Sequence, residues 1–276
     1  MQTKHAKFII TSVIYAVMMV ALLQACAPLP EETSEAAAPG KSYSINEAFE
    51  IVAKENDVAR TLYTKAIVGA GKKNGLKFHE DWEKDEMEAG PLPALFLRGI
   101  AGDIRKKGEV PLGLYLGSDF PIRKSNKFTG KQAELFAEMR KDSLPKFFYD
   151  EEAQLYTAMF PDFASAAPCV NCHNDHPETM KTDWVLGDIQ GATTWTYPSD
   201  SVSFEELQGM IMAYRDGAAA TLDTYIGKSK SFTEGGVPAV GEFPAKAGYS
   251  IPAPEVFLDS VNELAAEQTL KGILKI

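Results

Sequence analysis

Two cysteines and a histidine near the middle of the chain constrain its structure more than any other feature. In the sequence APCVNCHN, Cys169 and Cys172 are separated by two residues and His173 follows at once. This C-x-x-C-H spacing is the attachment signature of c-type haem. Two thiols this close can both add to the vinyl groups at one edge of a porphyrin, and the adjacent histidine is then held beneath the iron as proximal ligand. The motif occurs once, so the sequence predicts one covalent haem c.

Two other uses of the cysteine pair stay open. Cys169, Cys172 and His176 could bind zinc with His173 or an outside ligand as the fourth donor, although such a set is crowded for a closed tetrahedron. A disulfide or a thioredoxin-like dithiol is the other alternative. A thioredoxin-like pair needs a helix start that follows a strand, and Pro168 and the polar residues after the motif do not favour one. Haem attachment is the interpretation that the motif favours.

The N-terminus has the pattern of an export signal. A short region with two lysines and a histidine precedes an apolar run from Phe8 to Leu23. This run is short for a membrane-spanning helix and ends among small residues, as a signal peptide does. The sequence LLQAC then resembles a bacterial lipobox, which implies that the thiol of Cys26 receives a diacylglycerol and becomes the mature N-terminus. We therefore expect residues 1–25 to be a lipoprotein signal peptide.

A stretch rich in Pro, Ala, Glu and Ser follows. Residues 26–43 offer little apolar surface to bury, so we expect a flexible tether between the lipid and a folded body. Ala27 stands where an aspartate retains some bacterial lipoproteins in the inner membrane. The sequence therefore favours a periplasmic protein anchored in the outer membrane.

The rest of the chain has the composition of a folded protein, with 45% hydrophobic and 24% charged residues. Ser44-Ile45-Asn46-Glu47 is a capping box, so we expect a helix from residue 45 to about 68, which Gly69 and Gly71 would end. Further helices are expected at 91–106, 129–141, 204–226 and 254–270, with Gly272 just beyond the last. Strands are expected at 110–116, 147–149, 154–160 and within 184–197. A linker rich in Gly and Pro is expected at 227–253.

Short motifs in the middle of the chain resemble a family of single-haem periplasmic domains, found at the front of bacterial adenylate cyclases and histidine kinases. The matching stretches are Leu62-Tyr63-Thr64, Pro91-Leu92-Pro93-Ala94, Leu114-Tyr115, Phe120-Pro121, Cys169-Val170-Asn171-Cys172-His173-Asn174, His176-Pro177, Lys181-Thr182-Asp183-Trp184, Gly187-Asp188 and Gly191-Ala192. The resemblance implies an α+β fold, with a PAS-like antiparallel sheet flanked by helices around a haem pocket, over residues 44–200. Residues 201–276 would form a C-terminal helical extension. No output module follows the domain, so signalling within this chain is not expected.

The ligand opposite His173 decides what a haem at this site could do. His79 is far from the motif in sequence and is the expected distal ligand, whereas His176 would stay on the proximal side. The resemblance implies a cysteine thiolate in some relatives, but here Cys26 would be lipidated. An open position is one alternative. Methionine ligands are the other: Met87, Met139, Met159 and Met180.

These features predict an exported monohaem cytochrome that transfers electrons to or from a redox partner protein. A haem-based redox or gas sensor acting through a signalling partner is the alternative. We do not expect an enzyme, because peroxidase-like catalysis would need an open iron site with distal acid or base groups. The net charge of −10 argues against nucleic acid as a partner, and the membrane would be reached through the N-terminal lipid.

Overall fold

The structure is a computed structural model and describes residues 40–233, 236–241 and 249–274. The signal peptide expected at 1–25, the lipidation site Cys26, most of the tether and part of the linker at 227–253 lie outside these residues. No helix in the described ranges is both long and apolar enough to span a membrane.

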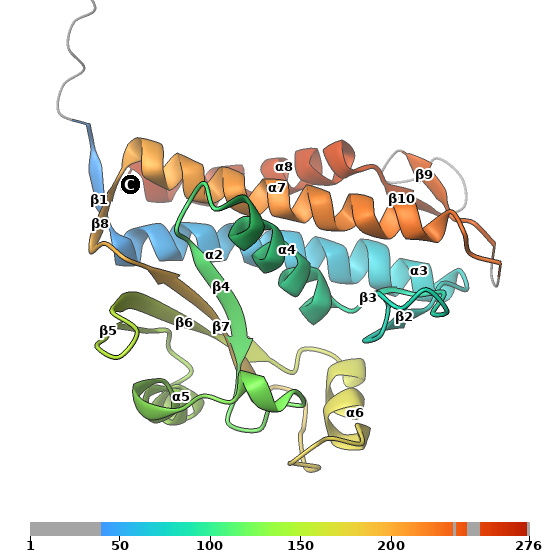
Figure 1. The fold of residues 1–276 in the computed structure, drawn as a ribbon, viewed down its shortest axis with the longest axis horizontal. Coiled ribbons are helices and arrows are strands. Elements are labelled where there is room, and N and C mark those ends of the chain that lie inside the picture. The colour runs from blue at the N-terminus through green and yellow to red at the C-terminus, as the bar shows by residue number, and fades with distance from the viewer. Residues whose placement is uncertain (1–39, 234–235, 242–248, 275–276) are drawn as a thin grey trace, which may run out of the picture. The chain divides into compact units, whose positions relative to one another are not determined.

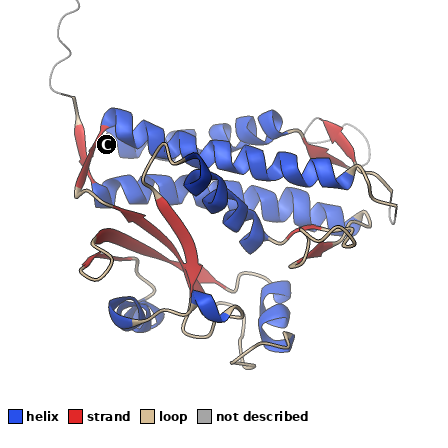
Figure 2. Ribbon diagram, in the orientation of Figure 1, coloured by secondary structure: helices blue, strands red, loops and turns tan. Residues whose placement is uncertain are grey.

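A four-stranded antiparallel sheet forms the β layer of the fold (Figures 1 and 2). Its strands are β4 (Gly113–Gly117), β5 (Lys146–Asp150), β6 (Leu155–Phe163) and β7 (Ile189–Tyr197). Their order is β4-β7-β6-β5, so the first strand pairs with the last. The predicted strands are confirmed with small shifts. The stretch 184–197 yields a single strand that starts at Ile189, because Gly187 has a φ of 91° and turns the chain before it.

Long helices cover one face of the sheet (Figure 1). They are α2 (Ile45–Leu62), which continues through the π-helical η2 (Tyr63–Gly69) into α3 (Ala70–Lys73), α4 (Pro93–Lys107), α7 (Phe204–Ser229) and α8 (Pro254–Leu274). Ser44 and Ser203 cap α2 and α7 with complete capping boxes, and Gly108 ends α4 in the left-handed conformation. The helical predictions are thus confirmed at these ends.

Helix α5 (Gly130–Asp142) covers the other face, where a smaller cluster of apolar side chains lies. Phe136 and Met139 of this helix are fully buried. Because side chains alternate along a strand, neighbouring residues of β6 serve different cores. Ala158 packs in the large core under the long helices, and Met159 packs in the small core under α5.

Three glycines, Gly69, Gly71 and Gly272, were expected to end a helix or to lie just beyond one, but all three lie inside helical segments, and those predictions are wrong. The first helix runs on to Lys73, and a Cβ at Gly71 would come 3.0 Å from the ring of Phe78. Helix α8 runs on to Leu274, and a Cβ at Gly272 would come 2.6 Å from Cγ1 of Ile51 on α2. Gly71 and Gly272 therefore allow close packing of their helices against other elements. From the sequence alone, glycine near the end of a helical pattern indicates a helix stop.

The folded body begins before the predicted end of the tether at residue 43. Strand β1 (Ser42–Ser44) pairs antiparallel with β8 (Ser201–Ser203). Tyr43 is buried, and its hydroxyl donates a 2.9 Å hydrogen bond to the carbonyl of Ile273 near the end of α8. The polar composition of residues 26–43 did not predict strand β1, because a single buried aromatic side chain, Tyr43, is enough to fix so short a strand.

The boundary predicted at residue 200 runs through one hydrophobic core. Side chains on both sides of it belong to that core, among them Phe49 and Phe96 before the boundary and Leu222, Phe257 and Val261 after it. Residues from Lys41 onward form one compact unit. The C-terminal helices are therefore packed into the same body as the sheet.

Two short parallel pairings, a 3₁₀ turn and one more helix complete the described structure. Strand β2 (Phe78–His79) pairs parallel with β3 (Gly90–Pro91), and β9 (Ala239–Gly241) pairs parallel with β10 (Ser250–Pro252). The 3₁₀ turn η3 (Lys124–Asn126) follows β4. The remaining helix, α6 (Ala167–Asp175), carries the C-x-x-C-H motif.

Candidate cofactor site

The cysteine pair and the histidine lie on a helix, where the sequence predicted a loop. Helix α6 begins soon after strand β6 ends at Phe163, and Pro168 stands in its first turn, where the fixed φ of proline suits a helix start. The absence of such a helix was the argument against a thioredoxin-like dithiol, and that argument is wrong. The choice between haem and dithiol therefore depends on the side chains themselves.

The helix places the three motif side chains on one side. An α-helix turns by about 100° per residue, so Cys169, Cys172 and His173 fall within about 100° of arc. Both cysteines are free thiols, Cys169 half-buried and Cys172 exposed. Partial desolvation by neighbouring groups and the nearby Glu80 carboxylate raise the pKa of the Cys172 thiol. A reactive dithiol needs a lowered thiol pKa, so this environment does not favour thiol exchange.

The imidazole of His173 is half-buried and lacks one hydrogen bond. Its Nδ1 atom is shielded from solvent and has no hydrogen-bond partner among the described residues. Burial lowers the pKa of His173, although the negative charge of Asp162 acts in the opposite direction. The ring is therefore held in the neutral form that binds metals.

Two contacts fix the segment that follows the motif. The side-chain amide of Asn174 donates to the carbonyl of Trp184 at 3.0 Å, and the Trp184 N–H donates to the Asn174 Oδ1 at 2.9 Å. The Thr179 hydroxyl donates to the carbonyl of His173 at 2.6 Å. The chain from 179 to 184 is thus folded back against α6. Sequence reasoning assigned Trp184 to a strand and gave Asn174 no role, although both stand within the motifs that carry the resemblance.

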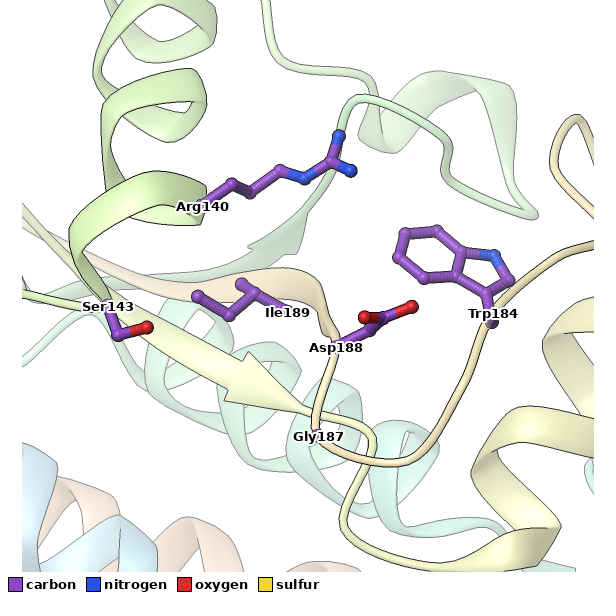
Figure 3. Close-up of a pocket in the computed structure, with 6 residues that line it drawn as sticks. All are labelled: Arg140, Ser143, Trp184, Gly187, Asp188 and Ile189. Carbon is purple, nitrogen blue, oxygen red and sulfur yellow. The ribbon is translucent and has the colours of Figure 1, made fainter.

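The indole of Trp184 contacts the His173 ring of the motif, and Trp184 also lines a small cavity (Figure 3). On one side its ring is perpendicular to the His173 ring, with centroids 6.1 Å apart. The cavity measures about 150 Å³. Figure 3 shows the residues that line it: Arg140, Ser143, Trp184, Gly187, Asp188 and Ile189.

An ion pair lies near the motif where strand β6 leaves its regular register. Arg60 of α2 and Asp162 of β6 approach to 2.8 Å, and the pairing of β6 with β7 shifts between Asp162 and Phe163. Desolvation lowers the pKa of His173, and the Asp162 carboxylate is the charged group that opposes this lowering. A bulge at this point redirects the chain towards α6.

The structure brings the segment with His79 beside α6 without turning the imidazole inward. Both carboxylate oxygens of Glu80 lie 3.1 Å from Nε2 of His176, at the C-terminal end of α6. His79 itself lies in β2, is exposed, and accepts a 3.1 Å hydrogen bond from the Asp81 N–H at Nδ1. Distal ligation by His79 therefore stays a prediction.

The methionine alternatives differ in their surroundings. Met139 and Met159 are fully buried in the small core, and Met87 packs against the large core. Met180 is 51% exposed and lies in the segment that folds back on α6. Of the four, Met180 has the side chain that is most open to a ligand role.

Zinc binding receives no support from the described part of the chain. There, no group of three or more His, Cys, Asp or Glu side chains is arranged to hold a metal ion. The proposed zinc donors Cys169, Cys172, His173 and His176 are thus not gathered into a coordination shell. A haem would require only His173 from the motif as an iron ligand, with the thiols bound to the porphyrin.

Comparison with known proteins agrees with the motif. The sequence model of the Tll0287-like family matches residues 33–198, a span that contains the whole four-stranded sheet and α6. Domains of this family are cytochrome c-like. No curated protein and no solved structure matches the chain. The helices α7 and α8 lie beyond the matched residues.

Proposed function

The chain belongs to the Tll0287-like family of cytochrome c-like domains, and from this premise we propose that it is an exported monohaem c-type cytochrome lipoprotein. It would carry electrons in the periplasm or at the outer membrane. Thioether bonds from Cys169 and Cys172 would hold the haem, and His173 would be its proximal iron ligand. The bound group would supply one-electron chemistry at its iron.

The observation that carries the proposal is the arrangement on α6. Two free thiols and a neutral imidazole share one side of the helix, and a nitrogen of that imidazole is buried without a hydrogen bond. These are the donors that covalent haem attachment requires. The sheet order, in which the first strand neighbours the last, supports the PAS-like part of the proposal.

Apolar side chains are exposed in the segments that precede and follow α6, which suits a large flat ligand. Phe163, Met180, Val185 and Leu186 are between 42% and 63% exposed, and all lie in the segment from the end of β6 to the start of β7. Where such side chains form one surface patch, the patch usually marks a ligand or partner site. A porphyrin has the apolar area to cover such side chains, whereas a zinc ion has none.

Electron transfer is preferred over sensing because the segment with His79 reaches α6 through the contact of Glu80 with His176. A second protein ligand would leave the iron closed to small gases, as a redox carrier requires. The exposure of His79 favours the second candidate, a haem-based redox or gas sensor that acts through a partner protein. We propose no catalytic residue.

The test is a double substitution with an internal control. The variant Cys169→Ser with Cys172→Ser, produced in the periplasm of a host with cytochrome c maturation proteins, should lose all covalent haem on a denaturing gel stained for haem. The control Cys26→Ala should keep its haem and move from the membrane fraction to the soluble fraction, since only the lipid would be lost. Haem that stays attached to the double variant would refute the assignment.

The two candidate functions are separated by spectra of the wild-type protein. A six-coordinate low-spin haem that does not bind carbon monoxide would favour electron transfer. Ready binding of carbon monoxide to the reduced protein would favour the sensor. Membrane retention of Cys26→Ala with the same lipid mass would argue against lipidation at that residue.

A further inference from the structure

Trp184 is buried at the centre of an aromatic and cationic group beside the motif. The residue is 2% exposed. One ring neighbour is His173, perpendicular to the indole with centroids 6.1 Å apart. The other is Phe120, which meets the indole at a 73° interplanar angle with centroids 6.4 Å apart. One side of the His173 ring therefore packs against a buried aromatic side chain, Trp184.

Two cations lie against the same indole. The ammonium of Lys181 is 4.6 Å from the ring centroid, and the guanidinium of Arg140 is 6.0 Å from it. Cations within about 6 Å of an indole are attracted by its electron-rich face. The backbone of Trp184 is held by its two hydrogen bonds with Asn174, the residue that follows His173. The indole is thus fixed at both its backbone and its ring.

We infer that Trp184 is a positioning residue, which fixes the plane of the His173 ring and keeps water from that side of it. The inference rests on the proposed function in one respect, since the ring that it positions would be the proximal haem ligand. It adds a residue that the motif does not contain. Ring pairs at right angles are a favoured arrangement, so the indole can hold the imidazole in one rotamer.

The orientation of an axial imidazole affects the iron that it binds. Groups around a haem ligand tune the metal through its orientation, its hydrogen bonds and the exclusion of solvent. His173 Nδ1 has no hydrogen bond among the described residues, so ring packing is the contact that can set its plane. Loss of the indole should therefore change the ligand field and admit water, which favours the more highly charged ferric state.

The experiment compares haem-loaded variants that differ only in this packing. They are Trp184→Phe, Trp184→Ala and Lys181→Met, with Trp195→Phe as the matched control. Trp195 is also a fully buried indole, but it lies in the large core against Tyr214. Covalent haem is quantified first, and then the ferric electron paramagnetic resonance spectrum and the reduction potential are recorded.

We expect Trp184→Ala to shift the ferric g values and lower the reduction potential, with smaller shifts in Trp184→Phe and Lys181→Met. Trp195→Phe should keep the wild-type values. If Trp184→Ala does not fold, Trp184→Phe and Lys181→Met are compared with the wild type and with Trp195→Phe instead. Wild-type g values and potential in haem-loaded Trp184 variants would overturn the inference, as would equal shifts in the Trp195 control.

A second readout separates this inference from the haem assignment. In protein made without haem attachment, the ring current of Trp184 should displace the proton resonances of the His173 ring, and Trp184→Phe should move them. Unchanged His173 resonances would overturn the inference even if haem binding is correct. A wild-type chain without covalent haem would refute the proposed function, and the His173 resonances would still decide the role of Trp184.

Discussion

Arg215 of α7 makes a two-pronged ion pair with Glu55 of α2, through hydrogen bonds of 3.0 Å from Nε and 2.9 Å from Nη2. The carboxylate side chain is fully buried, whereas the arginine side chain is 20% exposed. The hydroxyl of Thr269 on α8 also donates a hydrogen bond to the same carboxylate. Three helices that are far apart in sequence therefore meet at one buried charge.

Arg215→Met should destabilise the protein strongly, because it leaves the Glu55 carboxylate buried without its cation. Breaking a buried pair on one side costs about 3–5 kcal/mol. The free energy of unfolding in urea is the measurement, and Glu55→Met added to the first change should restore much of the loss. Lys271→Met is the control, because its pair with Glu267 is exposed to solvent on both sides and should change the free energy of unfolding far less. Equal effects of the two single changes would contradict the buried role of Glu55.

Gly272→Ala should also destabilise the protein, although alanine is the better helix former. The new Cβ would lie 2.6 Å from Cγ1 of the buried Ile51, and overpacking of this kind costs about 1–3 kcal/mol. Gly227→Ala in α7 meets nothing within 4 Å and should instead gain up to about 1 kcal/mol. Opposite changes in melting temperature are expected. A stabilised Gly272→Ala would mean that α8 does not approach α2 so closely.

Local signals in the sequence predicted most of the elements but not how they pack. The capping boxes at Ser44 and Ser203 and the stop at Gly108 act within a few residues, so they could be identified without a structure. Gly71 and Gly272 could not, because their role depends on side chains that approach from other elements. The same holds for the membership of α7 and α8 in the large core.

The site was predictable to the extent that its chemistry is local. Cys169, Cys172 and His173 stand side by side in the chain, so their spacing indicated their use. The contact of Trp184 with His173 and the contact of Glu80 with His176 depend on how distant segments fold back on α6. The spacing of apolar and polar residues along the sequence does not predict contacts between distant segments.

Asp57→Asn should stabilise the protein at neutral pH and change little at acid pH. Asp57 lies on the exposed side of α2, but desolvation by neighbouring groups raises its pKa above the ordinary value of 3.8, although Arg60 lowers it in part. A carboxyl with a raised folded-state pKa binds its proton more tightly in the folded chain. The wild type therefore loses stability as the pH rises from 3.8 through the raised pKa, and the neutral amide avoids that loss.

The control for that pH dependence has the opposite sign. Asp142 accepts a hydrogen bond from Lys146, which lowers its pKa, so Asp142→Asn should lose stability at neutral pH and match the wild type only in acid. Unfolding in urea at several pH values measures both differences. A constant difference between Asp57→Asn and the wild type across this range would contradict the raised pKa of Asp57.

His79→Ala should open the distal side of the haem if His79 is the second iron ligand. The expected result is near-complete conversion from a low-spin to a high-spin spectrum, with binding of carbon monoxide to the reduced form. Bis-histidine ligation typically gives a lower potential than His/Met ligation, so the wild type should have a low potential. His176→Gln is the control and should keep the low-spin spectrum. An unchanged spectrum in His79→Ala would point to Met180 or to an open site.

The pairing of β1 with β8 has a mechanical consequence for a chain that is held at its N-terminal end. A pull along the backbone first reaches Ser42–Ser44, which is bonded to Ser201–Ser203 and, through Tyr43, to the carbonyl of Ile273. The load is thus divided between the middle and the far end of the chain before it enters α2. The first segment to yield under such a load is a three-residue strand, and its release would leave the helix with the cysteine motif unstretched.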